Sequence, residues 1–246
     1  HGWYRRQRQM CIRDRRMAFP IPKSFPHKIA AGVFMVYGTS YHGLVQRAKI
    51  NKQDEVLVLG AAGGVGLAAV DIAKSFGARV VAAVSTKEKA EICKGYGVDD
   101  VVIYGEEKLD KEGQKALTKE LKSKSVRGGF SIIYDPIGDC FAEPALRSIS
   151  WGGTYLVVGF AAGKIPLFPT NLMLLKGCAV SGVFIGRFQQ EEPQQNAQNL
   201  KEIGELLSSG KLTPFISETI PMSKSVDAIE RIAKRGVVGK VVFIND

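Results

Sequence analysis

From Val56 to Val183 the chain alternates short apolar runs with longer segments in which apolar and polar residues recur at helical spacing. The short runs have the length of buried parallel strands, and the longer segments are typical of helices that cover a sheet. The predicted strands are Val56 to Leu59, Val80 to Val84, Asp100 to Ile103, Ser131 to Tyr134, Thr154 to Val158 and Ala179 to Val183. The predicted helices between them are Val65 to Phe76, Lys87 to Tyr96, Lys111 to Lys122, Phe141 to Ile149 and Asn171 to Leu175. This alternation predicts an α/β fold with a doubly wound parallel sheet, a Rossmann-type fold.

The pattern differs on both sides of this region. A helical segment, His27 to Ala48, precedes it and is interrupted by glycines that suggest close packing. After Gly186 we expect two helices, Pro193 to Leu207 and Ser225 to Lys234, and two extended segments, Phe215 to Ile220 and Lys240 to Ile244. We therefore divide the chain into a helical lead-in (17–50), a Rossmann domain (51–211) and a C-terminal segment (212–246).

The first predicted strand ends in a glycine-rich turn, Gly60-Ala61-Ala62-Gly63-Gly64-Val65-Gly66. Glycine tolerates positive φ and has no side chain, so such a turn can bring backbone N–H groups and a helix N-terminus against a pyrophosphate. The turn therefore predicts a dinucleotide-binding site. A plain strand-to-helix connection is the alternative.

The end of the second strand indicates which dinucleotide is bound. NAD-specific sites usually place a carboxylate there to bind the ribose 2′-hydroxyl. Here the strand ends in Ser85 and Thr86, followed by Lys87 and Lys89. Hydroxyl groups and cations suit a 2′-phosphate, so we expect NADPH rather than NADH. The lysines could instead only decorate an exposed helix start.

Two further positions fall at the carboxyl edge of the predicted sheet, where ligands bind in doubly wound folds. Tyr104, after the third strand, could contact the adenine ribose or simply cover the sheet end. Asp135, after the fourth strand, could contact the cofactor or form a turn. Tyr41 and His42 lie on the early helix, and we expect both to pack rather than to catalyse. No proton donor is assigned, and the catalytic residues are unknown from the sequence.

Net charge does not point to a nucleic-acid partner. Half of the formal charge of +10 lies in residues 1–16, where six arginines face one acid, Asp14. The run from Met10 to Arg15 is similar to one reading frame of a transposon-end adapter used in sequencing libraries, so we interpret residues 1–16 as non-native read-through. A targeting or RNA-binding arm is the alternative.

Cysteines and histidines exclude several other classes. The four cysteines are widely spaced and form no C-x-x-C pair, which is typical of reduced thiols in a cytoplasmic protein. The three histidines are too scattered for a zinc cluster, so we predict that the protein binds no metal. No apolar run approaches the length of a membrane span, so we expect no membrane partner.

Several motifs in order resemble the quinone oxidoreductase (zeta-crystallin-like) branch of the zinc-independent medium-chain dehydrogenases and reductases. The motifs are Val36 to His42, Gly60 to Gly66, Asp135-Pro136-Ile137-Gly138, Trp151-Gly152-Gly153, Val157 to Phe160 and Val238 to Val242, and the resemblance covers Met17 to Asp246. In zinc-dependent relatives a cysteine ligand lies about six residues before the position of Tyr37, where this chain has Ala31. This substitution also disfavours zinc.

The resemblance implies a set of cofactor-binding residues. Ala62, Gly63, Gly64, Val65 and Gly66 would hold the pyrophosphate, and Lys89 and Tyr104 would lie near the adenine ribose phosphate, beside the Ser85 hydroxyl already noted. Gly159, Phe160, Val183 and Phe184 would flank the nicotinamide, Thr39 would lie near the cofactor, and Arg235 would make a C-terminal contact.

The resemblance also implies that the chain is N-terminally truncated. Full members begin with a GroES-like, β-rich catalytic domain, and the segment after about Leu212 returns to that domain's sheet. Its strands would therefore lack partners here, and we expect exposed edges. A homodimer through the strand Ala179 to Val183 would also follow from the resemblance.

We therefore expect an NADPH-dependent oxidoreductase fragment that transfers hydride to a quinone or another conjugated carbonyl without a metal. Reduction of an enoyl thioester or enone double bond is an alternative. A non-catalytic nucleotide- or RNA-binding protein is an alternative of another class. We do not expect nucleic acid as a partner, because acids interleave with the main basic cluster, which runs from Lys111 to Lys124.

Overall fold

The computed structural model describes residues 21, 25–233 and 237–245, and its central element is a six-stranded parallel sheet in the order β3-β2-β1-β4-β5-β6. The strands are β1 (Glu55–Leu59), β2 (Arg79–Val84), β3 (Asp100–Ile103), β4 (Phe130–Asp135), β5 (Ile149–Val157) and β6 (Ala179–Gly182). The order reverses direction at β1, between β2 and β4, as in a Rossmann fold. The predicted fold class is confirmed.

Both faces of the sheet are covered because the central strands are apolar on both sides. Val56 and Val58 of β1 belong to the core beneath α2 (His27–Tyr41), α3 (Gly64–Ser75), α4 (Lys87–Gly95) and α9 (Pro193–Ser208). Leu57 and Leu59 point to the second core, beneath α5 (Lys111–Lys124) and α6 (Ala142–Arg147). The period-two alternation of a strand thus divides one apolar run between two cores.

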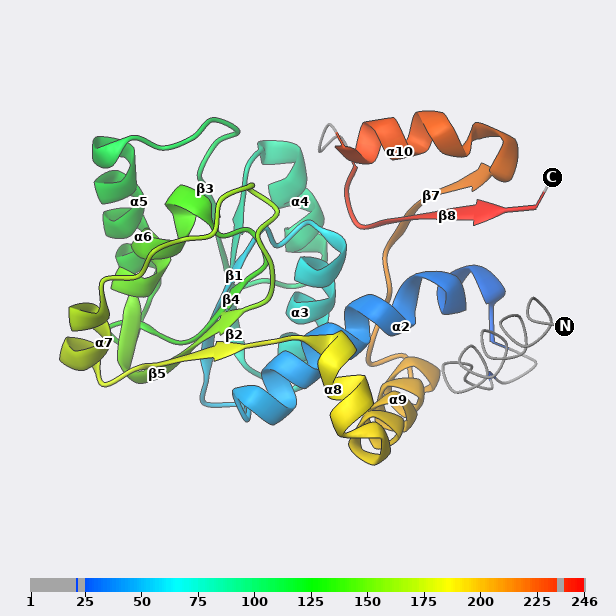
Figure 1. Ribbon diagram of the computed structural model, residues 1–246, viewed down its shortest axis with the longest axis horizontal. Coiled ribbons are helices and arrows are strands. Elements are labelled where there is room, and N and C mark those ends of the chain that lie inside the picture. The colour runs from blue at the N-terminus through cyan, green and yellow to red at the C-terminus, as the bar shows by residue number, and fades with distance from the viewer. Residues whose placement is uncertain (1–20, 22–24, 234–236, 246) are drawn as a thin grey trace, which may run out of the picture.

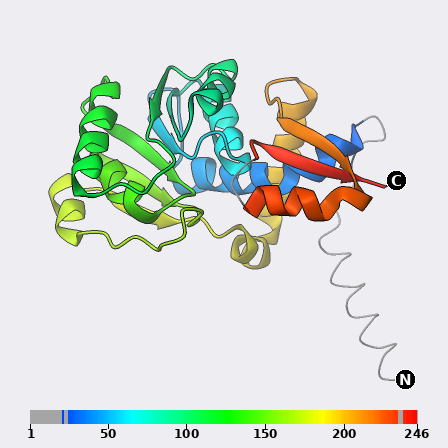
Figure 2. The same ribbon diagram turned by 90° about the horizontal axis from the view of Figure 1, so that it is seen from above.

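The C-terminal segment forms a separate small unit. It consists of β7 (Ile216–Pro221), η3 (Met222–Lys224), α10 (Ser225–Ala233) and β8 (Lys240–Ile244), and β7 pairs with β8 in parallel. Among the described residues neither strand has a second neighbour, so each leaves one edge open. Helix α2 runs along both the main sheet and this unit, and joins them (Figures 1 and 2).

The early helical segment has nearly its predicted bounds: it is α2 continued by the π-helical stretch η1 (His42–Arg47). Two other predicted boundaries are wrong. The segment predicted as the helix Phe141 to Ile149 is η2 (Asp139–Phe141) followed by α6, and β5 already begins at Ile149. A β-bulge in the pairing of β4 with β5 accommodates this early start, with Gly152 at a φ of 71°.

Helix α8 (Ile185–Glu191) was not predicted, and helix α7 (Thr170–Lys176) is one residue longer at each end than predicted. Helix α8 begins where we expected only a change of pattern. It was missed because Gly186 lowers the helical propensity of its first turn. Helix α7 extends past Leu175 and ends at Gly177 in the left-handed conformation. Packing of Phe188 on His42 holds α8 in place.

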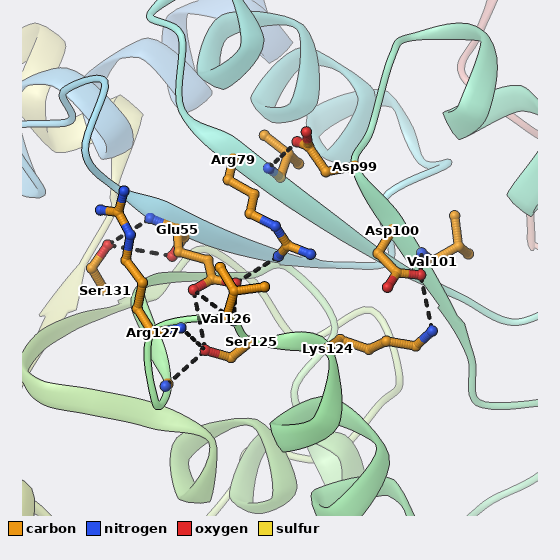
Figure 3. Close-up of polar contacts among 12 residues, drawn as sticks. Glu55, Arg79, Asp99, Asp100, Val101, Lys124, Ser125, Val126, Arg127 and Ser131 are labelled. Carbon is orange, nitrogen blue, oxygen red and sulfur yellow. Dashed lines mark hydrogen bonds and ion pairs between the residues drawn. The ribbon is translucent and has the colours of Figure 1, made fainter.

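The amino end of the sheet is fixed by a buried carboxylate (Figure 3). Glu55 is only 2% exposed, and its side chain accepts hydrogen bonds from Arg79 Nη1 (2.5 Å), Ser125 Oγ (3.1 Å) and the Val126 N–H (3.0 Å). Its own N–H donates to Ser131 Oγ at 2.9 Å. Glu55 thereby joins β1 and β2 to the loop that precedes β4, on the side of the sheet opposite the glycine turn.

We expect Glu55→Gln to lower the free energy of unfolding by about 2 kcal/mol, because it removes the anion that pairs with Arg79 inside the protein. Urea unfolding measures the change. The control is Glu112→Gln, which breaks an exposed ion pair with Lys115 and should cost less than about 0.5 kcal/mol. Equal losses in the two variants would contradict the role of Glu55.

Candidate cofactor site

The glycine turn places the start of α3 directly beneath the end of β1. Gly60 has a φ of 57°, and the Gly63 N–H donates to the Gly60 carbonyl at 2.9 Å. A Cβ on Gly66 would overlap the Gly60 carbonyl oxygen and would lie 2.8 Å from both Cα and O of Ala61. Only glycine allows helix and strand to approach so closely.

This turn leaves the start of α3 suited to an anion. Gly63 is the N-cap residue and has no side chain to cap the helix. The N–H groups of the first turn have no partner inside a helix, and the helix dipole adds partial positive charge at the same point. Backbone donors from Val65 and Gly66 can therefore address a pyrophosphate, whereas the parallel bridge between Gly63 and Gly239 engages the Gly64 N–H.

At the end of β2, Ser85 and Lys89 lie together, two of the four residues on which the NADPH prediction rests. Lys89 Nζ donates to Ser85 Oγ at 2.8 Å. Thr86 is the N-cap of α4, and its hydroxyl accepts from the Lys89 N–H at 3.3 Å. This cap fixes the first turn of α4 so that a hydroxyl and an ammonium group lie together at the end of β2.

Tyr104 follows β3 and packs over the sheet end. Its N–H donates to the Val84 carbonyl at 2.9 Å, and its ring lies 4.6 Å from the ring of Phe141. The covering role that we gave as an alternative is therefore present. Contact with the adenine ribose stays a prediction.

Asp135 is a turn former. It is 1% exposed, and its Oδ1 accepts from the N–H groups of Ile137 and Gly138, each at 2.8 Å. Its Oδ2 accepts from the Tyr155 hydroxyl at 2.6 Å. Burial raises the pKa of this carboxyl group. Of the two interpretations that the sequence left open, the hydrogen bonds favour the turn over a cofactor contact.

The residues predicted to flank the nicotinamide differ in their surroundings. Phe160 is 40% exposed and lies over Gly138, where an added Cβ would be 3.0 Å from Phe160 Cδ1. Phe184 is 73% exposed. Val183 is buried against Gly43 and Tyr134, so its side chain belongs to the core. Gly159 approaches Pro136, whose carbonyl oxygen would lie 3.2 Å from an added Cβ.

Thr39 is buried on α2, and its hydroxyl donates to the Met35 carbonyl of its own helix at 2.7 Å. The neighbouring Ser40 makes the longer-range contacts, which sequence reasoning missed. Ser40 Oγ donates to the Val65 carbonyl at 2.9 Å and lies 2.8 Å from the Tyr134 hydroxyl. Since Ser40 has one proton to give, Tyr134 is the donor in the second bond. Ser40 thus joins α2 to the start of α3, and no local sequence signal marks it.

Tyr41 and His42 pack, as predicted. The Tyr41 hydroxyl donates to Glu202 Oε2 at 2.6 Å. His42 stacks on Phe188 with ring centroids 3.8 Å apart, and its Nδ1 lies 3.3 Å from Gln46 Oε1. Burial lowers the pKa of His42, so the ring is neutral at pH 7.

The C-terminal unit contacts the glycine turn directly. The Gly239 N–H donates to the Ala62 carbonyl at 3.0 Å, and Gly239 forms an isolated parallel bridge with Gly63. Arg235, predicted to contact the cofactor, lies outside the described residues, as do residues 1–16. Within the described part of the chain no group of three or more His, Cys, Asp or Glu side chains could hold a metal ion.

No helix in the described ranges is both long and apolar enough to cross a membrane. The parallel sheet, the strand reversal and the glycine turn together define a Rossmann-type α/β protein. Residues 64–202 match the family described as zinc-binding dehydrogenase. The chain belongs to this family, and its motifs resemble the zinc-independent quinone oxidoreductase branch within it.

Individual relatives agree with this assignment. The chain is 34% identical to the "Quinone oxidoreductase-like protein 2 homolog" of Nematostella vectensis, over 95% of this chain and 62% of the relative. It is 28% identical to the "Acryloyl-coenzyme A reductase" of Sulfurisphaera tokodaii, over 90% of this chain and 60% of the relative. A mycobacterial protein solved in complex with NADPH shares the fold, with a TM-score of 0.81 and 24% identity over 91% of this chain and 66% of that one. The chain thus spans less than two thirds of its curated relatives.

Proposed function

We propose that the chain is the cofactor-binding part of an NADPH-dependent oxidoreductase that transfers hydride to a quinone or another conjugated carbonyl. The observation that carries the proposal is the glycine turn: Gly66 lets α3 start directly beneath β1, where the N–H groups of Val65 and Gly66 can bind a pyrophosphate. The name of the Nematostella relative supports the quinone.

In this proposal residues 62–66 hold the pyrophosphate, and Ser85 and Lys89 bind the 2′-phosphate. Tyr104 lies near the adenine ribose. The nicotinamide side is formed by Thr39, Gly159, Phe160, Val183 and Phe184. Because Val183 is buried, it supports this side by packing in the core and does not contact the cofactor itself. Arg235 makes a C-terminal contact.

The bound nicotinamide would supply the hydride. The protein would orient the ring, exclude water and present the acceptor to one face of it. No step requires a metal in this scheme, and the predicted absence of metal stays a prediction. The domain division at residues 16, 50 and 211 is part of the same proposal, with the segment 212–246 continuing into a catalytic domain.

Lys89→Ala should weaken NADPH binding about tenfold and leave NADH binding unchanged, because only NADPH carries the phosphate that the ammonium group would bind. Calorimetric titration of the full chain with each cofactor measures both constants. Lys94→Ala is the control: Lys94 lies on the same helix, and its ion pair with Glu91 is exposed. An absence of NADPH binding by the unmodified chain would overturn the proposed function.

Reduction of an enoyl thioester is the second candidate, and the name of the Sulfurisphaera relative favours it. Loss of NADPH absorbance on adding a para-quinone, compared with loss on adding an acryloyl thioester, distinguishes the two acceptors. The RNA-binding alternative gains little support, since Lys115 and Lys124 of the basic cluster pair with Glu112 and Asp100.

We also propose a homodimer through the strand Ala179 to Val183. Strand β6 is an edge of the sheet, and Val180 on it is exposed. Trp151, Leu174 and Leu175 expose further apolar surface. A sedimentation profile that shows only monomer would contradict the dimer. The cytoplasmic location stays a prediction.

A further inference from the structure

The segment that connects the Rossmann domain to β7 is held by hydrogen bonds at Thr213. The Thr213 N–H donates to Asp71 Oδ2 at 2.7 Å, and the Thr213 carbonyl accepts from the Tyr96 hydroxyl at 2.5 Å. The Tyr37 hydroxyl donates to the same Asp71 oxygen at 2.6 Å. We call Tyr37, Asp71, Tyr96 and Thr213 the Thr213 clamp.

The clamp anchors the crossing segment in the core of the Rossmann domain. Tyr37 comes from α2, Asp71 from α3, and Tyr96 from the end of α4. Tyr37 and Asp71 are both buried. Burial raises the pKa of Tyr96 to about 12, so its hydroxyl keeps the proton that it donates. Asp71 of α3 and Tyr96 at the end of α4 therefore bind the N–H and the carbonyl group of Thr213, and Tyr37 of α2 holds Asp71.

A short route leads from the clamp to the glycine turn. Two residues after Thr213, Phe215 lies against Gly239: a Cβ there would overlap the Phe215 ring and would lie 3.2 Å from the Phe215 carbonyl oxygen. Gly239 has a φ of 63°, which favours glycine. Its N–H holds the Ala62 carbonyl, and the adjacent Lys240 pairs with Ile216 of β7.

This contact is close at the backbone itself. The Gly239 carbonyl oxygen would lie 3.2 Å from a Cβ on Gly64, the first residue of α3. The cavity between Tyr37, Gly64, Phe215 and Gly239 measures only about 10 Å³, too little for rearrangement of a side chain. A shift of Phe215 must therefore move Gly239, and a shift of Gly239 must move the glycine turn.

We propose that Tyr37, Asp71 and Tyr96 are positioning residues for the dinucleotide, because the Thr213 clamp holds Gly239 against the glycine turn. This inference rests on the proposed function, which assigns the turn to the cofactor's pyrophosphate. A turn rich in glycine loses much conformational freedom when it binds a ligand. Fixing it beforehand from outside lowers that cost and tightens binding.

The test compares Tyr37→Phe and Tyr96→Phe with Tyr41→Phe in the full chain. Each change removes one hydroxyl and keeps the ring. Tyr41→Phe is the matched control, because it loses an equally short bond from α2 to a carboxylate, Glu202, that does not contact Thr213. The readouts are the NADPH dissociation constant and the hydrogen-exchange rate of the Gly239 amide.

Both clamp variants should weaken NADPH binding about three- to tenfold and speed exchange at Gly239 by a similar factor. Tyr41→Phe should change neither. Unchanged Gly239 exchange in the clamp variants would overturn the inference, and so would equal effects in Tyr41→Phe, which would indicate general destabilisation.

If the unmodified chain binds no NADPH, the proposed function fails, and Gly239 exchange alone decides on the clamp. Faster exchange at Gly239 in Tyr96→Phe would then still show that the Thr213 clamp holds Gly239 in place. Unchanged exchange would overturn that role of the clamp.

Discussion

Replacing Gly66 with alanine should weaken NADPH binding by about 100-fold and lower the free energy of unfolding by about 3 kcal/mol. The added Cβ would meet the Gly60 carbonyl oxygen and the Cα and O of Ala61. These are backbone atoms, which cannot rotate away as a side chain can. The start of α3 must then move away from β1, and its N–H groups move with it.

Urea unfolding and calorimetric titration measure the two effects of Gly66→Ala. Gly204→Ala is the control, since Gly204 lies inside α9 with no heavy atom within 4 Å of an added Cβ. That change should stabilise the protein by about 0.5–1 kcal/mol, because alanine has the higher helical propensity. It should leave NADPH affinity unchanged. Wild-type affinity in Gly66→Ala would refute the assignment of the turn.

Asp135→Ala should lower the free energy of unfolding by about 3–5 kcal/mol, because three buried donors lose their acceptor. These donors are the N–H groups of Ile137 and Gly138 and the Tyr155 hydroxyl. Asp135→Asn should cost only about 1 kcal/mol. Its amide oxygen can still accept both N–H groups, and only the bond from Tyr155 must change.

The asparagine variant separates the two roles of Asp135. If the residue only forms the turn, Asp135→Asn binds NADPH within about twofold of the wild type, since the turn survives. A large loss of affinity together with near-normal stability would instead indicate a contact between the carboxylate and the cofactor. Thermal unfolding and calorimetry on the same preparations distinguish these outcomes.

The pH dependence of the free energy of unfolding gives a second check on the burial of the Asp135 carboxyl group. Burial raises the native pKa of Asp135 above its ordinary value, so the folded state favours the protonated carboxyl group. The stabilisation from this group is complete below the ordinary value of 3.8 and is lost as pH rises through the native pKa. The stability of the wild type relative to Asp135→Asn should therefore fall as pH rises above about 4.

The sheet could be predicted because its strands are marked locally. Apolar runs such as Val56 to Leu59 and the glycines after them identify a buried strand and a tight turn without any knowledge of distant residues. The prediction failed where local signals were weak or in conflict. Helix α8 contains Gly186, and the early start of β5 depends on a bulge against β4. Tertiary pairing decides both.

The candidate site follows the same division. The sequence by itself determined the glycine turn, the hydroxyl and cation at Ser85 and Lys89, and the family, because turn chemistry and motif order are local properties. Only the tertiary structure decided that Asp135 forms a turn, that Ser40 joins two helices to β4, and that Thr213 is clamped by Asp71 and Tyr96. These roles are hydrogen bonds between residues far apart in the chain, and a pattern of neighbours carries no information about which distant partner the fold supplies.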